Sequence, residues 1–312
     1  MVKLMRTIGK KLIANLKSTF ALVEIFRKIV QFSLLILFNS AIFGLAAVPI
    51  TLPILFSSGL PFRIIDDTLS VMQKMIYDAI FPLLPLASIL IFGALVGRAL
   101  CGWACPLGLI QDILAAGRVK KIAISFKTHK NLTNVKYIIL GLTLLTSISL
   151  SLAQFSARGR IYREILGSFA KAPFTSLSPS DTLFAVIPRL LVNLSLSFYV
   201  GFDYSLITPL LVTRIIILVA VLFLAAHVPR AWCRYLCPQG AFLALISRFS
   251  LLGLKRDPVR CVKAKCHICE DACPMKVPIL SLPRDKFADP ECIYCLRCVT
   301  ACPTKAIRLK FP

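Results

Sequence analysis

Two short segments of the chain carry cysteines at the same spacing, followed by the same proline and glycine. They read CGWACPLG from Cys101 to Gly108 and CRYLCPQG from Cys233 to Gly240. Together with the residues before them, both fit the pattern R-A-x-C-x-x-x-C-P-x-G, which begins at Arg98 and at Arg230. A shared pattern of this length indicates an internal duplication. We call Arg98–Gly108 the first repeat and Arg230–Gly240 the second repeat.

The cysteines of the two repeats are candidate ligands of one metal centre. They are Cys101, Cys105, Cys233 and Cys237. Cysteines four residues apart lie on one face of a helix, one turn apart, so we expect each pair to present two neighbouring thiols. If the apolar segments before the repeats are neighbours, four thiolates converge, which is the ligand set of one [4Fe-4S] cluster. Arg98 and Arg230 would then help to offset its negative charge. The alternatives are a redox-active dithiol or inter-helix disulfide, and zinc or another structural metal.

The C-terminal region carries two further cysteine motifs, each closed by a proline. The second motif is C-x2-C-x2-C-x3-C-P and comprises Cys292, Cys295, Cys298 and Cys302. The first motif has a longer opening gap and comprises Cys261, Cys266, Cys269 and Cys273. This pattern is the bacterial ferredoxin run, which holds two [4Fe-4S] clusters.

The fourth cysteine of each motif is expected to bind the cluster of the other motif, as in two-cluster ferredoxins. One predicted ligand set is therefore Cys261, Cys266, Cys269 and Cys302. The other is Cys273, Cys292, Cys295 and Cys298. Structural zinc is the alternative, but zinc ribbons use two well-separated C-x2-C pairs, so the packed motifs favour iron–sulfur clusters. His267 lies inside the first motif, and we expect it to be a loop residue rather than a ligand.

The composition indicates a membrane protein. Of the 312 residues, 57% are hydrophobic and only 16% are charged, whereas soluble domains carry about 25% charged residues. The net charge of +23 is explained by the excess of Lys and Arg in cytoplasmic segments, so a nucleic-acid partner is not expected. The twelve cysteines fall at ligand spacings, which indicates metal binding rather than disulfides.

Four segments are apolar enough for the roughly 20 residues that span a bilayer. The predicted spans are Ile29–Val48, Pro82–Leu100, Tyr137–Phe155 and Leu210–Val228. A fifth stretch, Leu183–Phe202, is interrupted by polar residues and a proline, and we interpret it as an interfacial or re-entrant helix. Basic residues cluster before the first span, between the second and third, and after the fourth. This distribution predicts a multi-pass inner-membrane protein with both termini in the cytoplasm.

The predicted fold class is an α-helical membrane protein with four transmembrane helices and a small C-terminal α+β domain of the bacterial 2[4Fe-4S] ferredoxin type. Residues 1–28 form a basic amphipathic segment on the inner membrane surface. Residues 29–252 form the membrane domain with the two repeats, and residues 253–312 the cytoplasmic ferredoxin-like domain. His227, at the end of the fourth span, is a candidate proton acceptor for a quinol, although a polar helix end is the simpler interpretation.

The doubled C-x3-C-P after apolar segments, followed by two cubane motifs, resembles the NapH/MauN-type membrane ferredoxins. The polyferredoxin parts of the NosR and CcoG proteins are similar. The resemblance covers about Phe26 to Phe311. It implies an electron-transfer subunit of a quinol-linked oxidoreductase complex. Such a subunit passes electrons between the quinone pool and a partner: a ferredoxin-like protein, a flavoprotein or a multihaem cytochrome.

Two other functions are compatible with these residues. A redox assembly or regulatory factor, similar to CcoG or NosR, would use the same centres to reduce a metal or a thiol while another enzyme matures. A structural anchor would only hold a soluble reductase at the membrane. An anchor does not need twelve cysteines at ligand spacing, so electron transfer is the preferred interpretation.

Overall fold

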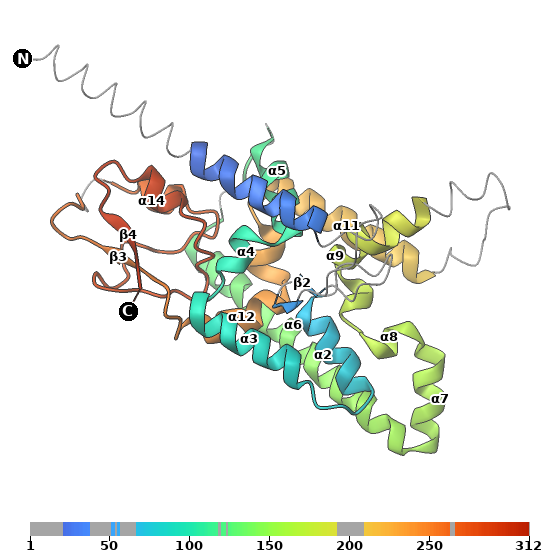
Figure 1. Cartoon of the computed structure of the whole chain (residues 1–312). Coiled ribbons are helices and arrows are strands. Elements are labelled where there is room, and N and C mark those ends of the chain that lie inside the picture. The colour runs from blue at the N-terminus through green and yellow to red at the C-terminus, as the bar shows by residue number, and fades with distance from the viewer. Residues whose placement is uncertain are drawn as a thin grey trace, which may run out of the picture. The chain divides into compact units, whose positions relative to one another are not determined.

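The computed structural model of the chain (Figure 1) is mostly helical, with a few short strands. It describes residues 21–37, 51–53, 55–56, 67–117, 120–122, 124–191, 209–262 and 266–311. The chain forms two compact units, and each is composed of segments that are far apart in the sequence.

The first unit is made of described residues within Met1–Leu34, Ile91–Leu109 and Leu243–Pro312. Its elements are a helix over residues 21–37, the end of α3 (Leu83–Val96), α4 (Ala99–Trp103), the start of α5 (Pro106–Ala116), the end of α12 (Pro238–Ser247), β3 (Gly253–Arg256), α13 (Ile268–Asp271), α14 (Arg297–Ala301) and β4 (Ile307–Lys310). The cysteine-rich C-terminal region thus belongs to the same unit as the first repeat.

Strands β3 and β4 flank the two cysteine motifs and pair antiparallel, with Gly253 opposite Lys310 and Arg256 opposite Ile307. The same region is drawn in red and orange in Figure 1. Leu254 on β3 also forms an isolated bridge with Phe287. Arg256 is buried, and its guanidinium donates to the carbonyl oxygen of Ile279 at 2.9 Å. Because a buried polar group must find a partner, this bond holds the chain between the motifs against the strand pair.

The second unit is made of described residues within Leu35–Leu90 and Ile110–Phe242. Its strands are β1 (Thr51–Leu52) and β2 (Leu55–Phe56). It shares α3, α5 and α12 with the first unit, and its other helices are α2 (Thr68–Tyr77), α6 (Phe126–Leu152), α7 (Ala157–Leu166), α8 (Ser168–Lys171), α9 (Pro179–Asp181), α11 (Pro209–His227) and a helix over residues 187–191. It also contains 3-10 turns at Ala153–Phe155 and Thr175–Leu177 and π-helical turns at Thr182–Val186 and Trp232–Leu236.

The core of the second unit lies between α2 and α6. Leu69 and Met72 of α2 pack with Leu140 of α6 and with Ala241 at the start of α12. Asp67 caps α2, since its carboxylate accepts from the backbone N–H of Ser70 at 2.8 Å. This cap satisfies one of the N–H groups that the first turn of a helix leaves without a partner.

Two of the described helices, Lys127–Phe155 and Pro209–His227, are long and apolar enough to cross a membrane by length and composition. They lie where the third and fourth spans were predicted. Large apolar side chains on both remain exposed, among them Leu145 on the first and Phe223 on the second. Within the first, Ser147 donates its hydroxyl to the carbonyl oxygen of Thr143 at 2.8 Å, which satisfies a polar group in an apolar helix.

The helix at the predicted second span is shorter than the predicted Pro82–Leu100. Helix α3 comprises 14 residues, Leu83–Val96, about 21 Å at 1.5 Å per residue. It ends because Gly97 adopts a left-handed φ of 58°, a common helix C-terminus. A Cβ at Gly97 would lie 3.0 Å from Oγ of Ser247 and 3.3 Å from the Tyr294 ring, so the position has little room for a side chain.

The remaining membrane predictions fall partly outside the described residues. Residues 21–37 form one helix that runs through the predicted boundary between residues 28 and 29, while residues 1–20 and 38–50 are outside the described part. Arg27 and Gln31 are fully buried on this helix, whereas Ile29 and Phe32 on its other side are each 56% exposed. For Leu183–Phe202, the described residues up to 191 are helical, and residues 192–202 lie outside.

Candidate metal centres

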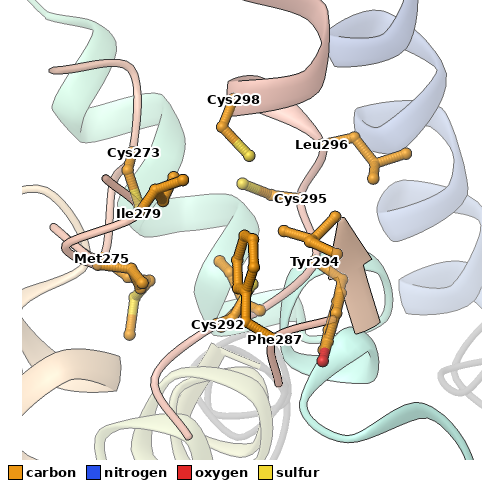
Figure 2. A pocket seen from close by; sticks show the side chains of 12 residues that line it. Cys273, Met275, Ile279, Phe287, Cys292, Tyr294, Cys295, Leu296 and Cys298 are labelled. Carbon is orange, nitrogen blue, oxygen red and sulfur yellow. The ribbon is translucent and has the colours of Figure 1, made fainter. Parts of the chain in front are cut away.

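One pocket of the first unit collects cysteines from both ferredoxin motifs. Cys273 of the first motif lines it together with Cys292, Cys295 and Cys298 of the second. In Figure 2 the sulfur atoms of Cys295 and Cys298 point toward one another. The rest of the lining is almost entirely apolar: Leu254, Met275, Val277, Ile279, Phe287, Ile293, Tyr294 and Leu296. These four cysteines are the crosswise set that the spacing of the motifs predicts.

The arrangement of these thiols suits a multi-iron cluster. The pocket places four thiols around a common space. In a four-iron cluster each thiolate binds a different iron, whereas all ligands of a zinc ion meet at one atom.

The apolar surroundings disfavour free thiolates in this pocket. Burial raises the pKa of the Cys273 thiol to about 11, and the neighbouring Cys295 adds to the shift. Burial likewise holds the pKa of Cys292 and of Cys298 well above the usual value. The raised pKa values keep the free thiols of Cys273, Cys292 and Cys298 neutral at pH 7, and an iron that replaces the proton would offset the cost of the buried negative charge.

The other predicted ligand set is only partly brought together. Cys269 is buried on α13, and its pKa is raised to about 11 by burial, by Glu270 and by the nearby Cys266. Cys302 ends α14, and its sulfur accepts from the backbone N–H of Ala306 at 3.3 Å. Cys261 precedes residues 263–265, which are outside the described part. His267 is exposed, and its Nδ1 lies 3.6 Å from Oε2 of Glu270.

The two repeats fold locally in the same way, but not as the predicted helix with both cysteines on one face. In each repeat the second cysteine has left the helix, and its N–H donates five residues back: Cys105 to the carbonyl oxygen of Leu100 and Cys237 to that of Trp232. The prolines explain this correction, because a residue before proline is driven out of the α region. Accordingly, Cys237 has φ −74° and ψ 109°.

The next helix begins immediately after each pair. Pro106 starts α5 and Pro238 starts α12, at the first helical position where the missing N–H of proline costs nothing. In both repeats the carbonyl oxygen of the second cysteine accepts the first bond of the new helix, from Leu109 and from Ala241. The duplicated sequence thus produces a duplicated turn.

In the first repeat, the residues around Cys101 contact the second ferredoxin motif. Arg98 is fully buried and donates to Glu291 at 2.8 Å. Trp103 donates its indole N–H to the carbonyl oxygen of Tyr294 at 2.9 Å. Gln31, on the helix over residues 21–37, donates to the carbonyl oxygen of Gly102 at 2.9 Å. Arg98 was predicted to face a cluster, and in the structure its guanidinium is paired with a carboxylate.

In the second repeat, two neighbouring residues of α5 hold the segment that contains Cys233. Asp112 binds the buried Arg230 through two bonds, from Nε at 3.0 Å and from Nη2 at 2.7 Å. Gln111 accepts from the backbone N–H of Trp232 at 3.1 Å and donates to the sulfur of Cys233 at 3.2 Å. Because the backbone N–H needs an oxygen acceptor, the amide nitrogen of Gln111 must face the sulfur.

The positions between the cysteines have diverged between the repeats. Gly102 and Trp103 of the first correspond to Arg234 and Tyr235 of the second. Nδ1 of His129 on α6 lies 3.1 Å from Nη2 of Arg234 and 3.0 Å from the hydroxyl oxygen of Tyr235. Since a guanidinium can only donate, Nδ1 accepts, and the ring proton of neutral His129 lies on Nε2.

His227 lies at the end of α11, as predicted. Its Nδ1 is 3.0 Å from the carbonyl oxygen of Phe223, one turn earlier, and the two rings lie against each other. These are the contacts of a helix-terminal residue.

Several of these partners were not predicted from the sequence. Gln31, Gln111, Asp112 and His129 all act over more than 70 residues, and no local pattern marks such pairs. Gly102 did carry a signal, because a glycine stands where the other repeat has Arg234. Such a glycine indicates close approach of another backbone.

Comparison with known proteins assigns these sites to iron–sulfur families. The family described as "4Fe-4S binding domain" matches residues 79–125 and 210–257, and each match contains one repeat. The family described as "4Fe-4S dicluster domain" matches residues 260–307, which contain both ferredoxin motifs. Iron–sulfur clusters are therefore the cofactors that the cysteines and these matches support.

Relatives extend the similarity over most of the chain. An uncharacterized protein of Methanocaldococcus jannaschii is 28% identical over 232 residues, which is 72% of this chain and 77% of the relative. The ferredoxin-type protein NapH of Haemophilus influenzae is 27% identical over 273 residues, 85% of this chain and 76% of NapH. The methylamine utilization ferredoxin-type protein MauN of Methylobacillus flagellatus is also similar. This chain is a NapH/MauN-type ferredoxin protein.

This NapH/MauN-type protein is also related to the regulatory protein NosR. NosR of Pseudomonas aeruginosa is 27% identical over 217 residues, 68% of this chain but only 24% of NosR. The chain thus corresponds to about a quarter of NosR, and the remainder of NosR has no counterpart in the alignment. No solved structure matches the chain.

Proposed function

We propose that the chain is a membrane-bound iron–sulfur subunit that carries electrons between the quinone pool and a partner redox protein. Its similarity to ferredoxin-type proteins supports electron transfer in general. The observation that carries the proposal is the pocket lined by Cys273, Cys292, Cys295 and Cys298. This pocket brings cysteines of two motifs together among apolar side chains. A redox cluster requires such a setting, whereas an exposed dithiol does not.

The proposed ligands of the two ferredoxin clusters follow the crosswise pattern. One set is Cys273, Cys292, Cys295 and Cys298. The other is Cys261, Cys266, Cys269 and Cys302. A [4Fe-4S] cluster, when bound, supplies reversible one-electron chemistry without proton transfer. The chain's part is to supply four thiolates, to exclude water with residues such as Phe287 and Met275, and to fix the loop that carries them.

A third cluster at the two repeats is a further part of the proposal. Cys101 and Cys105 belong to the first unit and Cys233 and Cys237 to the second, so the convergence of the four thiols stays a prediction from the sequence. It is supported by the identical turns of the two repeats and by the match of each to a 4Fe-4S binding family. We keep Arg98, Arg230 and His227 as candidate contributors to this centre and to a quinone site.

The proposed location is the inner membrane, with four spans and with both termini and the ferredoxin domain in the cytoplasm. The two apolar helices and the basic cytoplasmic segments of the sequence support this topology. Other redox subunits, such as a flavoprotein, a ferredoxin-like protein or a multihaem cytochrome, are the proposed partners.

Iron counting after anoxic purification tests the cofactor proposal. We expect about eight irons per chain if the ferredoxin motifs alone are loaded and about twelve if the repeats hold a third cubane. EPR spectra during redox titration should resolve a signal for each centre. Stoichiometric zinc with little iron would contradict the proposal.

A second candidate function is a redox assembly or regulatory factor. The similarity to the regulatory protein NosR favours it. Such a factor would use the same clusters to reduce a metal or a thiol in another protein. Deletion of the gene separates the two functions: loss of quinol-dependent reductase activity with the reductase fully assembled indicates electron supply, whereas a reductase that lacks its metal indicates assembly.

A further inference from the structure

Within the first unit, the backbone of the first repeat packs directly against the backbone of the loop of the second ferredoxin motif. A Cβ built on Gly102 would lie only 2.3 Å from the carbonyl oxygen of Ile293 and 3.7 Å from the backbone nitrogen of Cys295. No side chain fits at that distance. The neighbouring Trp103 donates its indole N–H to the carbonyl oxygen of Tyr294. Both contacts are made by the residues directly after Cys101.

The contacted loop has an unfavourable backbone conformation. Tyr294 has φ 46° and Leu296 has φ 61°, and such left-handed values are uncommon for residues other than glycine. A conformation of this kind persists only where surrounding contacts determine it. Trp103 supplies one of these contacts, and the Tyr294 hydroxyl supplies another by donating to the carbonyl oxygen of Leu252 at 2.8 Å.

Salt bridges also hold the second motif. Arg98 donates to Glu291, beside Cys292, and to the carbonyl oxygen of Pro290 at 3.2 Å. Arg297, between Cys295 and Cys298, binds Glu24 of the helix over residues 21–37 through two bonds of 2.9 and 2.6 Å. Arg98 and Glu24, which lie outside the second motif, therefore hold it within the unit.

The first ferredoxin motif has a different environment. Val259 is 93% exposed and Val262 is 61% exposed, on either side of Cys261. Ile268, beside Cys269, is 46% exposed. The first motif thus carries exposed apolar side chains beside its cysteines, whereas the second motif is held by contacts with other segments of the unit.

We propose that Gly102 and Trp103 are positioning residues that couple the first repeat to the cluster site of the second motif. They hold the loop of Cys292 and Cys295 in the conformation that its thiols need. The site with Cys273, Cys292, Cys295 and Cys298 is then the inner one, next to the first repeat. The site with Cys261, Cys266, Cys269 and Cys302 is the outer one, where the neighbouring Val259, Val262 and Ile268 are exposed. This inference rests on the proposed binding of clusters at both ferredoxin sites.

Gly102→Ala in the full-length, anoxically purified protein tests this role. The added methyl must move the Ile293 carbonyl, so we expect a shift in the midpoint potential and line shape of one ferredoxin EPR signal. That signal should be the one that Cys295→Ala abolishes. The signal that Cys266→Ala abolishes should not change. Gly141→Ala is the matched control, because a Cβ at Gly141 meets nothing within 4 Å.

Trp103→Phe provides a second variant that keeps an aromatic ring against Phe26 and removes only the indole donor. A smaller shift of the same signal, at unchanged iron content, would support the proposal even if Gly102→Ala does not fold. The proposal would be overturned if both ferredoxin EPR signals stayed unchanged in the two variants. It would also be overturned if only the signal of the outer site shifted. Wild-type protein with neither ferredoxin signal would instead refute the proposed function, and this role with it.

Discussion

At the scale of single residues, the buried pair between Arg230 and Asp112 is the interaction whose loss should be most costly. Both side chains are almost fully buried and are joined by two bonds. Removing one partner leaves a buried charge without compensation, which typically costs 3–5 kcal/mol. We therefore expect Asp112→Leu to lower the free energy of unfolding by about 3–5 kcal/mol, measured by denaturant titration in detergent.

Two further variants make that measurement specific. Replacing both partners, Arg230→Met with Asp112→Leu, should restore much of the stability, since an apolar pair often substitutes for a buried ion pair. Arg260→Ala is the control at an exposed pair with Asp257, where the loss should be about 1 kcal/mol or less. Equal losses at Asp112 and Arg260 would show that burial of the pair is unimportant.

Gln111 gives a second prediction at this scale, which concerns the electronic environment of Cys233. A hydrogen bond to a ligand sulfur offsets its negative charge and so favours the reduced cluster. Gln111→Glu keeps the acceptor for the Trp232 N–H but replaces the donor to the sulfur with a negative oxygen. We expect the midpoint potential of the third centre to fall, as measured by EPR redox titration.

The iron content decides how a Gln111 result is interpreted. It should stay at the wild-type value in Gln111→Glu, because the backbone contact is retained. Gln154→Leu is a suitable control, since this glutamine accepts from Arg163 and lies away from the cysteines in sequence. An unchanged potential in Gln111→Glu would mean that the bond to Cys233 has no electronic role.

At the scale of elements, the prolines after the cysteine pairs determine where the thiols lie. Pro238 forces Cys237 out of the α region and starts α12. Pro238→Ala allows the helix to continue through Cys237 and should displace its sulfur. We expect loss of about four irons per chain, from about twelve to about eight, while both ferredoxin EPR signals persist.

Pro209→Ala is the matched control for this change. Pro209 also occupies the start of a helix, α11, but no cysteine precedes it. Its replacement should leave the iron content unchanged. If Pro238→Ala also keeps all its iron, the turn geometry at the second repeat is not required for a cluster.

Much of the element arrangement followed from local sequence signals. Cys273 lies with Cys292, Cys295 and Cys298 in one pocket, which agrees with the ligand spacing of the motifs, whereas the binding of a cluster there stays a prediction. The long apolar helices were found in their predicted places because their composition suffices. The early end of α3 was not predicted. Gly97 fits an apolar stretch in the sequence, and only its left-handed φ shows that the helix ends there. The contact of Gly102 with Ile293 depends on packing between distant segments, which one sequence does not encode locally.

At the scale of the whole molecule, the number of spans decides whether the repeats share one side of the membrane. The apolar helices that precede the two repeats bring both cysteine pairs to the same face of the membrane if a single span lies between them. The candidate for that span is Lys127–Phe155. A second crossing within Leu183–Phe202 would separate the pairs across the bilayer, and a shared cluster would then be impossible.

Reporter fusions distinguish the two topologies. Fusions after Pro312 and between Lys120 and Lys130 should report cytoplasm, and fusions near Asp67 and Ser178 the opposite side, because Lys and Arg accumulate on the cytoplasmic side. The informative fusion is the one after Pro312. A cytoplasmic C-terminus places an even number of spans before the ferredoxin domain when the N-terminus is also cytoplasmic. A periplasmic C-terminus would require the fifth crossing, and the cysteines of the two repeats would then have to serve separate sites.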